Sequence, residues 1–220
     1  MAGQPPPNRQ IPFDLPVRAA LGVEDFVVSA SNRDALAWLD RWPDWPGPAL
    51  AIYGPAGCGK SHLAHVWQSR GGARFLDGTE PDGPPPAPNL ILDEIALPEE
   101  RLFHLYNQLK AAGGSLLILS REPPARWQVR LPDLASRLAS IPAIAVAPPD
   151  DALLAAVLAK HFADRQLAVT ADVIDYLAHQ IERSFTAAAA TAAALDRAAL
   201  AQQRRPNLAL AREVLRAVRE

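Results

Sequence analysis

The feature that most restricts the fold of this chain is a glycine-rich segment between an apolar run and a helical pattern. Residues 54–61 read GPAGCGKS and fit the pattern G-x-x-x-x-G-K-[ST]. The preceding residues, ALAIY at 49–53, form a strand candidate, and residues 60–68 are predicted to be helical. A strand, a glycine-rich turn and a helix in this order are typical of a loop that binds phosphate through backbone N–H groups and the helix N-terminus.

The fixed positions of this phosphate loop have residue types that suit particular chemical tasks. Glycines let the backbone turn inward, the Lys60 ammonium reaches β- and γ-phosphates, and the Ser61 hydroxyl ligates Mg²⁺. Cys58 stands at a variable position, where we expect a small filler rather than a redox thiol. The predicted nucleotide-binding residues of this segment are Gly54, Pro55, Ala56, Gly57, Cys58, Gly59, Lys60, Ser61 and His62.

A second apolar run, NLIL at 89–92, ends in two acidic residues. Open α/β sheets bind ligands at the carboxyl ends of their strands, so we expect Asp93 and Glu94 beside the phosphates. Asp93 would hold Mg²⁺ through water, and Glu94 would polarise the attacking water. The predicted magnesium ligands are therefore Ser61 and Asp93.

Short apolar runs alternate with helical patterns as far as Pro148 and Pro149, and only helical patterns follow. The expected strands are residues 49–53, 74–76, 89–92, 115–119 and 141–146. The expected helices are residues 60–68, 99–112, 151–165, 171–180, 184–203 and 208–218, with Asp150 and Thr170 as N-caps. We predict an N-terminal tail at 1–20, an α/β domain with a five-stranded parallel sheet at 21–149, and a helical lid domain at 150–220.

Composition restricts the class of protein further. The chain has 220 residues, a net charge of −2 and one cysteine, and 49% of its residues are hydrophobic. Such a chain can bury a core, and a disulfide scaffold is excluded. No apolar run approaches the ~20 residues of a membrane span, and the start lacks a signal-peptide core. We expect a cytoplasmic protein without a membrane partner, and the near-neutral charge predicts only indirect contact with DNA.

Four short segments accompany the phosphate loop: FVVSASNR at 26–33, SREPP at 120–124, SRL at 136–138 and ERSF at 182–185. Together with the loop they resemble the AAA+ ATPase part of the bacterial initiator DnaA and, more closely, Hda-like proteins, the short DnaA homologues that inactivate the initiator. The resemblance covers nearly all of residues 10–218. It implies a P-loop NTPase module of the AAA+ class that binds ADP or ATP with Mg²⁺.

The resemblance also implies roles for individual residues. The first segment is similar to the F-[IV]-V-x-x-x-N-R box near the adenine, and its implied nucleotide contacts are Val27, Val28 and Asn32. SREPP resembles an S-D-R-P-P turn, in which Ser120 would be the sensor 1 residue. SRL is similar to an S-R-F box, in which Arg137 would be the arginine finger that reaches a nucleotide held by a neighbouring subunit. Arg183 would be the sensor 2 arginine of the lid. For both arginines a solvated surface position is the alternative.

The N-terminal segment QIPFDL at 10–15 resembles the clamp-binding peptide found at the start of Hda-like proteins. Gln10 would form hydrogen bonds in a small subsite, and Phe13 and Leu15 would enter a hydrophobic pocket on the sliding clamp, the β subunit of DNA polymerase. The implied clamp-binding residues are Gln10, Ile11, Phe13 and Leu15. In the alternative interpretation, Phe13 and Leu15 anchor the tail to its own domain.

The function implied by this resemblance is negative regulation of replication initiation. The chain would bind nucleotide, dock on the DNA-loaded clamp and present Arg137 to ATP held by DnaA, while its own ATPase activity stays weak. Two alternatives are a stand-alone AAA+ ATPase that remodels or loads a partner, and a DnaA-binding adaptor that does not stimulate hydrolysis. From the length we expect a module and lid without the DNA-reading domain of DnaA. A homodimer and the choice between ADP and ATP stay open.

Overall fold

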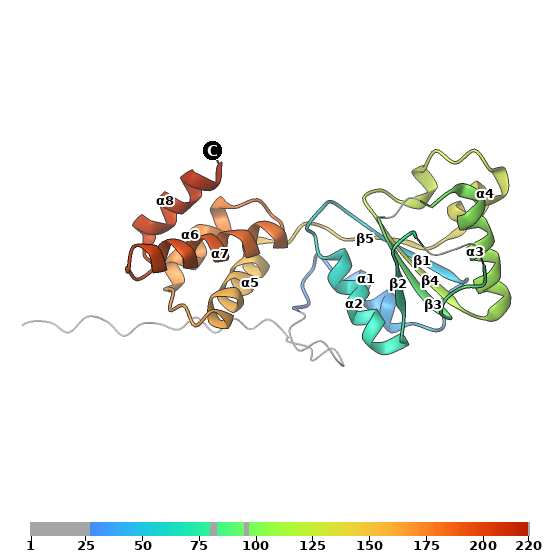
Figure 1. Cartoon of the computed structure of the whole chain (residues 1–220), viewed down its shortest axis with the longest axis horizontal. Helices are drawn as coiled ribbons and strands as arrows, with labels where there is room; N and C mark the ends of the chain where they lie inside the picture. Colours follow the sequence, from blue (N-terminus) through green and yellow to red (C-terminus); the bar gives the residue numbers. More distant parts are fainter. Residues whose placement is uncertain (1–26, 80–82, 95–96, 220) are drawn as a thin grey trace, which may run out of the picture. The chain divides into compact units, whose positions relative to one another are not determined.

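The computed structural model describes residues 27–79, 83–94 and 97–219, and the chain divides into two compact units between Pro149 and Asp150 (Figure 1). The first unit is built on a sheet, and the second is helical. The predicted clamp-binding residues lie outside the described residues: Gln10, Ile11, Phe13 and Leu15.

The sheet of the first unit has five parallel strands in the order β2-β3-β4-β1-β5. Its strands are β1 (Ala49–Tyr53), β2 (Arg74–Leu76), β3 (Asn89–Asp93), β4 (Ser115–Ser120) and β5 (Ala143–Ala145). The register places Tyr53 opposite Ser120 and Asp93 opposite Leu119, so β1, β3 and β4 end at one edge. The predicted α/β fold with a five-stranded parallel sheet is confirmed.

Helices cover both faces of this sheet (Figure 1). On one face lie α1 (Arg33–Asp40) and α2 (Lys60–Gly71), and on the other lie α3 (Glu99–Ala112) and α4 (Pro132–Ser140). A short 3-10 helix, Pro124–Arg126, precedes α4. Successive strand residues point to opposite faces, so Leu50 and Ile52 pack with α1 and α2, whereas Ala49 and Ala51 face the core beside α3 and α4.

The second unit consists of four helices around a core of its own. They are α5 (Asp151–Asp164), α6 (Ala171–Gln180), α7 (Phe185–Ala201) and α8 (Leu208–Arg219). Asp150 caps α5 as expected, since its Oδ1 accepts a hydrogen bond of 2.8 Å from the Leu153 N–H. Thr170 occupies the N-cap position of α6, but its side chain forms no capping hydrogen bond. Among the helices that the structure describes, none combines the length and apolar character that crossing a membrane requires.

Candidate functional site

The phosphate loop connects the end of β1 to the start of α2 at the carboxyl edge of the sheet. At Gly54 a Cβ atom would lie 2.3 Å from the Val146 carbonyl oxygen, so only glycine fits. Gly57 and Gly59 have φ values of 72° and 102°, in the left-handed region that glycine adopts without strain. The Gly54 N–H donates to the Ser120 carbonyl oxygen at 3.1 Å, which ties the loop to β4.

Lys60 is the first residue of α2, and only 5% of its surface is exposed. Its ammonium donates hydrogen bonds to the carbonyl oxygens of Gly54 at 2.9 Å and Pro55 at 3.0 Å. The Glu94 carboxylate completes this shell, with Oε1 lying 3.1 Å from Nζ. A buried ammonium is tolerated because its donors are satisfied. A bound phosphate would compete with these acceptors for the same charge.

Cys58 is a packing residue of the loop rather than a reactive one. Its side chain is 2% exposed and belongs to the core on the α1 and α2 side of the sheet. Burial raises the pKa of the Cys58 thiol above its ordinary value, although the Lys60 charge opposes the shift. The thiol therefore stays protonated at neutral pH, which disfavours redox or nucleophilic chemistry.

The side-chain oxygens of Ser61 and Asp93, the predicted magnesium ligands, lie together beside the phosphate loop. The Ser61 Oγ donates to Asp93 Oδ2 at 2.8 Å. Mg²⁺ commonly binds through one or two protein oxygens together with phosphate and water, and this pair fits that pattern. Within the described ranges, no cluster of three or more His, Cys, Asp or Glu residues suits a metal ion. The pair therefore suits Mg²⁺ that is held jointly with a nucleotide.

Glu94 follows β3 with a φ of 50°, and its N–H donates to the Leu119 carbonyl oxygen at 3.1 Å. Its carboxylate lies between two cations, because Oε2 accepts a hydrogen bond of 3.2 Å from the Arg121 Nε. Desolvation raises the pKa of Glu94, but hydrogen bonds and charges from Lys60 and Arg121 outweigh it and lower the pKa below its ordinary value. Glu94 is therefore ionised at neutral pH.

Arg121 lies at the site although none of the sequence motifs assigns it a role. Its side chain is 71% exposed, and it follows β4 directly, beside the strand that carries Glu94. One signal was available: SREPP carries a base where the similar S-D-R-P-P turn carries an acid. Because β3 and β4 are neighbouring strands, the arginine at this position lies beside Glu94.

Ser120, the predicted sensor 1 residue, reaches the loop through its backbone. The residue is 6% exposed, and its hydroxyl donates to the Glu122 carbonyl oxygen at 2.6 Å. Its own carbonyl oxygen accepts the hydrogen bond from Gly54 described above. The hydroxyl is thus engaged in the turn after β4.

The predicted adenine segment lies beside the end of the sheet that carries the phosphate loop. The residues placed near the base by their motif are Val27, Val28 and Asn32, of which the two valines are half-buried. The Asn32 side chain folds this segment, accepting from the Ser29 N–H at 2.9 Å and donating to the Val27 carbonyl oxygen at 3.0 Å. The Ala147 N–H then donates to the Ser31 carbonyl oxygen at 3.2 Å, which connects the segment to the chain after β5.

Arg137, the predicted arginine finger, lies on α4 and packs against α3. Its guanidinium carbon lies 4.2 Å from the centre of the Phe103 ring and 5.6 Å from that of Tyr106. Its Nη1 donates to the Asn107 side-chain oxygen. In the part of the chain that the structure describes, these contacts to α3 hold Arg137, and none joins it to the phosphate loop.

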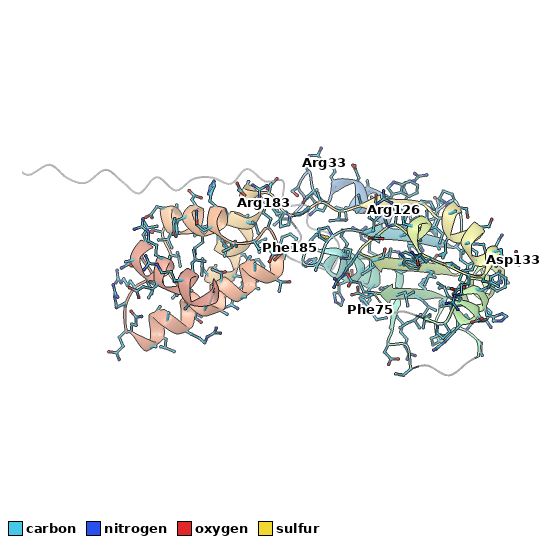
Figure 2. All side chains as sticks on the ribbon, turned by 90° about the horizontal axis from the view of Figure 1, so that it is seen from above. Arg33, Phe75, Arg126, Asp133, Arg183 and Phe185 are labelled. Atoms are coloured by element: carbon cyan, nitrogen blue, oxygen red, sulfur yellow. The ribbon has the colours of Figure 1, made fainter. Side chains whose placement is uncertain are left out.

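Arg183, the predicted sensor 2 residue, belongs to the helical unit, as does the neighbouring Phe185 (Figure 2). Its Nη2 lies 2.9 Å from the Asp151 Oδ1, and 61% of its side chain is exposed. The His179 Nε2 lies 3.8 Å from the other oxygen of Asp151. Asp151 thus anchors Arg183 to the start of α5.

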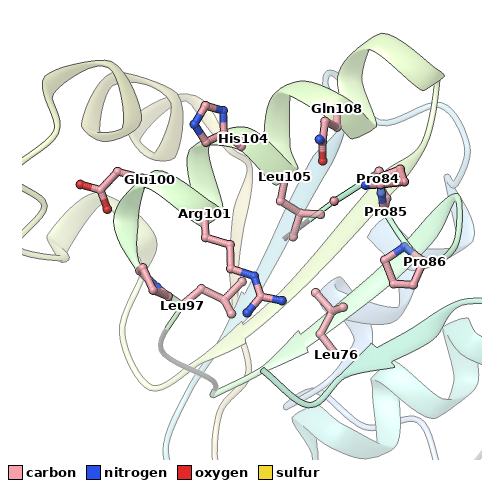
Figure 3. A pocket seen from close by; sticks show the side chains of 12 residues that line it. Leu76, Pro84, Pro85, Pro86, Leu97, Glu100, Arg101, His104, Leu105 and Gln108 are labelled. Atoms are coloured by element: carbon pink, nitrogen blue, oxygen red, sulfur yellow. The ribbon is translucent and has the colours of Figure 1, made fainter. Parts of the chain in front are cut away.

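Several cavities lie on the α3 side of the first unit, and two of them are relevant to the site. One, of about 500 Å³, is lined by Glu94, Ser120, Arg121 and Trp127 among others, so it adjoins the phosphate site. The other, of about 780 Å³, lies between α3 and the segment Pro84, Pro85 and Pro86 (Figure 3). None of the phosphate-loop residues lines this second cavity.

Sequence comparison finds similarity to the initiator DnaA. The chain is 29% identical over 195 residues to DnaA of Chloroflexus aggregans, with 71% of this chain and 40% of that protein covered. For DnaA of Cutibacterium acnes the identity is 25% over 192 residues, covering 72% and 38%. The chain therefore spans about two fifths of the length of the curated relatives it matches. No family model matches the chain.

Solved structures of DnaA and RuvB share the fold. Domain III of Thermotoga maritima DnaA aligns with a TM-score of 0.74 at 17% identity, covering 87% of this chain and 94% of that one. AMPPCP-bound DnaA from Aquifex aeolicus aligns with a TM-score of 0.62 at 18% identity, covering 76% and 62%. A RuvB mutant from Thermotoga maritima aligns with a TM-score of 0.65 at 14% identity, covering 85% and 68%. The chain thus shares the fold of DnaA domain III and of RuvB.

Proposed function

We propose that this chain is a nucleotide-binding AAA+ regulator of replication initiation that promotes hydrolysis of ATP bound to DnaA. The observation that carries the proposal is the convergence of Lys60, Ser61, Asp93 and Glu94 at one sheet edge, within a fold shared with DnaA domain III. Similarity to DnaA in sequence supports the assignment to the initiation system. The action on DnaA in trans rests on the resemblance of the short motifs to Hda-like proteins.

The chain's own nucleotide is ADP or ATP. Loop N–H groups and Lys60 hold the phosphates, while Ser61 and Asp93 hold Mg²⁺, which when bound neutralises phosphate charge. Val27 and Val28 contact the base from the segment that Asn32 folds. Ser120 and Arg183 report the phosphate state as sensors. In this proposal the nucleotide mainly sets conformation, and Glu94 turns it over slowly.

Arg137 is the residue that acts on the partner. A planar guanidinium can contact several oxygens of a transferring phosphoryl group, and an arginine supplied in trans accelerates such a reaction by orders of magnitude. The contacts of Arg137 with Phe103 and Asn107 show an ordered side chain rather than a freely solvated one. To reach ATP on DnaA, the guanidinium exchanges these contacts for the phosphate.

The N-terminal tail brings the protein to its place of action. Gln10, Ile11, Phe13 and Leu15 bind the sliding clamp, so the protein acts in the cytoplasm, at DNA that carries a loaded clamp, and reaches DNA through that partner. An extended segment can bind in this way at low cost, because little existing structure must unfold first.

The decisive experiment measures hydrolysis of DnaA-bound ATP in the presence of DNA-loaded clamp. Wild-type protein is expected to accelerate hydrolysis, and Arg137→Ala is expected to lose a factor of about 10³ or more of that acceleration. Arg126→Ala is the matched control, because Arg126 is exposed on the same unit. Absence of acceleration by wild type would overturn the regulator proposal, and DnaA binding without acceleration would favour the adaptor. Undiminished activity of Arg137→Ala would overturn the finger assignment.

A further inference from the structure

The Glu94 carboxylate has both of its oxygens engaged by different cations. Oε1 lies 3.1 Å from the Lys60 Nζ, and Oε2 lies 3.2 Å from the Arg121 Nε. A carboxylate that polarises a water accepts a hydrogen bond from it, and a cation at the same carboxylate competes for the lone pairs and weakens the group as a base. The paired Glu94 therefore has less capacity for this task than an unpaired carboxylate would have.

A bound nucleotide would affect the Lys60 and Arg121 ion pairs of Glu94 differently. Lys60 lies in the phosphate loop and is 5% exposed, so phosphate competes directly with Glu94 for its ammonium. The Arg121 side chain is 71% exposed and comes from the turn after β4. Occupation of the loop therefore releases Oε1 from Lys60 and leaves Oε2 paired with Arg121.

The pairing of β3 with β4 brings Glu94 and Arg121 together. Asp93 is opposite Leu119 in the ladder between β3 and β4, and the Glu94 N–H donates to the Leu119 carbonyl oxygen at 3.1 Å. Glu94 and Arg121 thus emerge from adjacent strand ends, and the backbone hydrogen bond to Leu119 fixes Glu94 independently of its side chain. Both line the cavity of about 500 Å³, which leaves space beside the pair.

We propose that Arg121 is a positioning residue that holds Glu94 in an ion pair and thereby slows hydrolysis of the nucleotide bound at this chain's own phosphate loop. The proposal rests on nucleotide binding by that loop, as set out above. In hydrolysis a water oxygen bonds to the γ-phosphorus, and the bond from that phosphorus to the β–γ bridging oxygen breaks. ADP, inorganic phosphate and a proton are the products. Through Oε2, Arg121 restrains the carboxylate and withdraws charge from it, so that the released Oε1 orients and polarises this water less effectively.

The central measurement is single-turnover ATP hydrolysis by the full chain without DnaA. Arg121→Gln is expected to raise the rate constant about two- to five-fold, the factor that corresponds to an exposed ion pair. Arg121→Lys keeps a cation and is expected to stay near the wild-type rate. Arg126→Gln removes the same charge from a nearby exposed position, and it too is expected to stay near wild type. An unchanged or lower rate for Arg121→Gln would overturn the proposal.

A double-mutant cycle separates action through Glu94 from a direct effect on phosphate. Glu94→Gln is expected to lower the rate, and adding Arg121→Gln to it should have no further effect. If Arg121→Gln changes the residual rate by the same factor in the Glu94→Gln background, the action does not pass through Glu94 and the proposal fails.

Nucleotide affinity gives a readout independent of turnover. In ATP titrations followed by a fluorescent nucleotide, Arg121→Gln is expected to change Kd by less than about three-fold. Lys60→Ala is expected to weaken binding by more than about ten-fold. If Arg121→Gln weakens binding as much as Lys60→Ala, Arg121 is a phosphate ligand and the proposal is overturned. If wild type binds no nucleotide, the proposed function fails with it, whereas binding without a gain in Arg121→Gln contradicts the role of Arg121 alone.

Discussion

At the scale of single residues, close backbone approach governs the phosphate loop. Lys60 remains buried because two carbonyl oxygens and one carboxylate surround its ammonium. Gly54 lets β1 lie against the chain after β5, where the Val146 N–H donates to the Tyr53 carbonyl oxygen at 2.7 Å. The same residues that shape the nucleotide site thus also contribute to the packing of the first unit.

Gly54→Ala is therefore expected to destabilise the fold as well as the site. The added Cβ would lie 2.3 Å from the Val146 carbonyl oxygen, which is backbone and cannot move freely. We expect the free energy of unfolding to fall by about 1–3 kcal/mol, measured by urea denaturation. Gly47→Ala is the control, since its Cβ would lie 4.0 Å from the Tyr106 hydroxyl, and it should change stability by less than about 0.5 kcal/mol. Equal stability of the two variants would contradict the proposed crowding.

At the scale of elements, α3 and α4 are joined by the carboxylate of Glu99. This residue begins α3, and its Oε2 accepts hydrogen bonds from the Arg130 N–H at 3.0 Å and the Leu131 N–H at 2.8 Å. Leu131 is the N-cap residue of α4, so the bonds hold the entry of that helix. These hydrogen bonds from backbone N–H groups lower the pKa of Glu99 below its ordinary value.

The lowered pKa predicts how stability depends on pH. A carboxyl whose folded-state pKa is below its unfolded value stabilises the fold above the unfolded pKa, here near the model-compound value of 4.5. That contribution is lost as pH falls through the folded-state pKa. Glu99→Gln should therefore be less stable than wild type at pH 7, and the difference should shrink as pH falls below 4.5. Urea denaturation at several pH values measures this difference.

Glu100→Gln provides the control for this titration. Glu100 is an exposed acid in the same first turn of α3, so the variant changes the same charge near the same helix terminus. A stability difference for Glu99→Gln that is constant with pH, or equal to that of Glu100→Gln, would show that the Glu99 hydrogen bonds do not carry the effect.

At the scale of the whole molecule, the proposed nucleotide site and the proposed clamp-binding peptide belong to different parts of the chain. The phosphate site lies within the first unit, whereas the clamp-binding peptide is predicted in the N-terminal tail. Loss of one activity should therefore leave the other intact, because the residues involved are separate.

Gln10→Ala combined with Phe13→Ala tests this separation. We expect the double variant to lose capture by immobilised sliding clamp, because its hydrogen-bonding side chain and an apolar anchor are both removed. ATP affinity should remain within about two-fold of wild type, and Lys60→Ala should show the reverse behaviour. Retained clamp capture by the double variant would overturn the clamp assignment.

The local pattern of the sequence predicted much of the fold. ALAIY, NLIL and SLLIL lie in strands because runs buried on both faces are apolar throughout, and those strands extend to Tyr53, Asp93 and Ser120. The run at 141–146 was predicted too long, since β5 covers only Ala143–Ala145 and Pro142 has no N–H to donate to the ladder. The loop between β1 and α2 was recognised because its turn requires glycine at fixed positions.

The sequence by itself thus determined the strands, the phosphate loop and the pair of acids after β3, because apolar runs and turn chemistry are local properties. Only the tertiary structure decided which charges meet. Arg121 contacts Glu94 because β4 lies next to β3, and Arg137 packs on Phe103 because α4 lies against α3. Such contacts depend on strand order and side-chain direction, which join residues far apart in the chain and leave no periodic pattern in it.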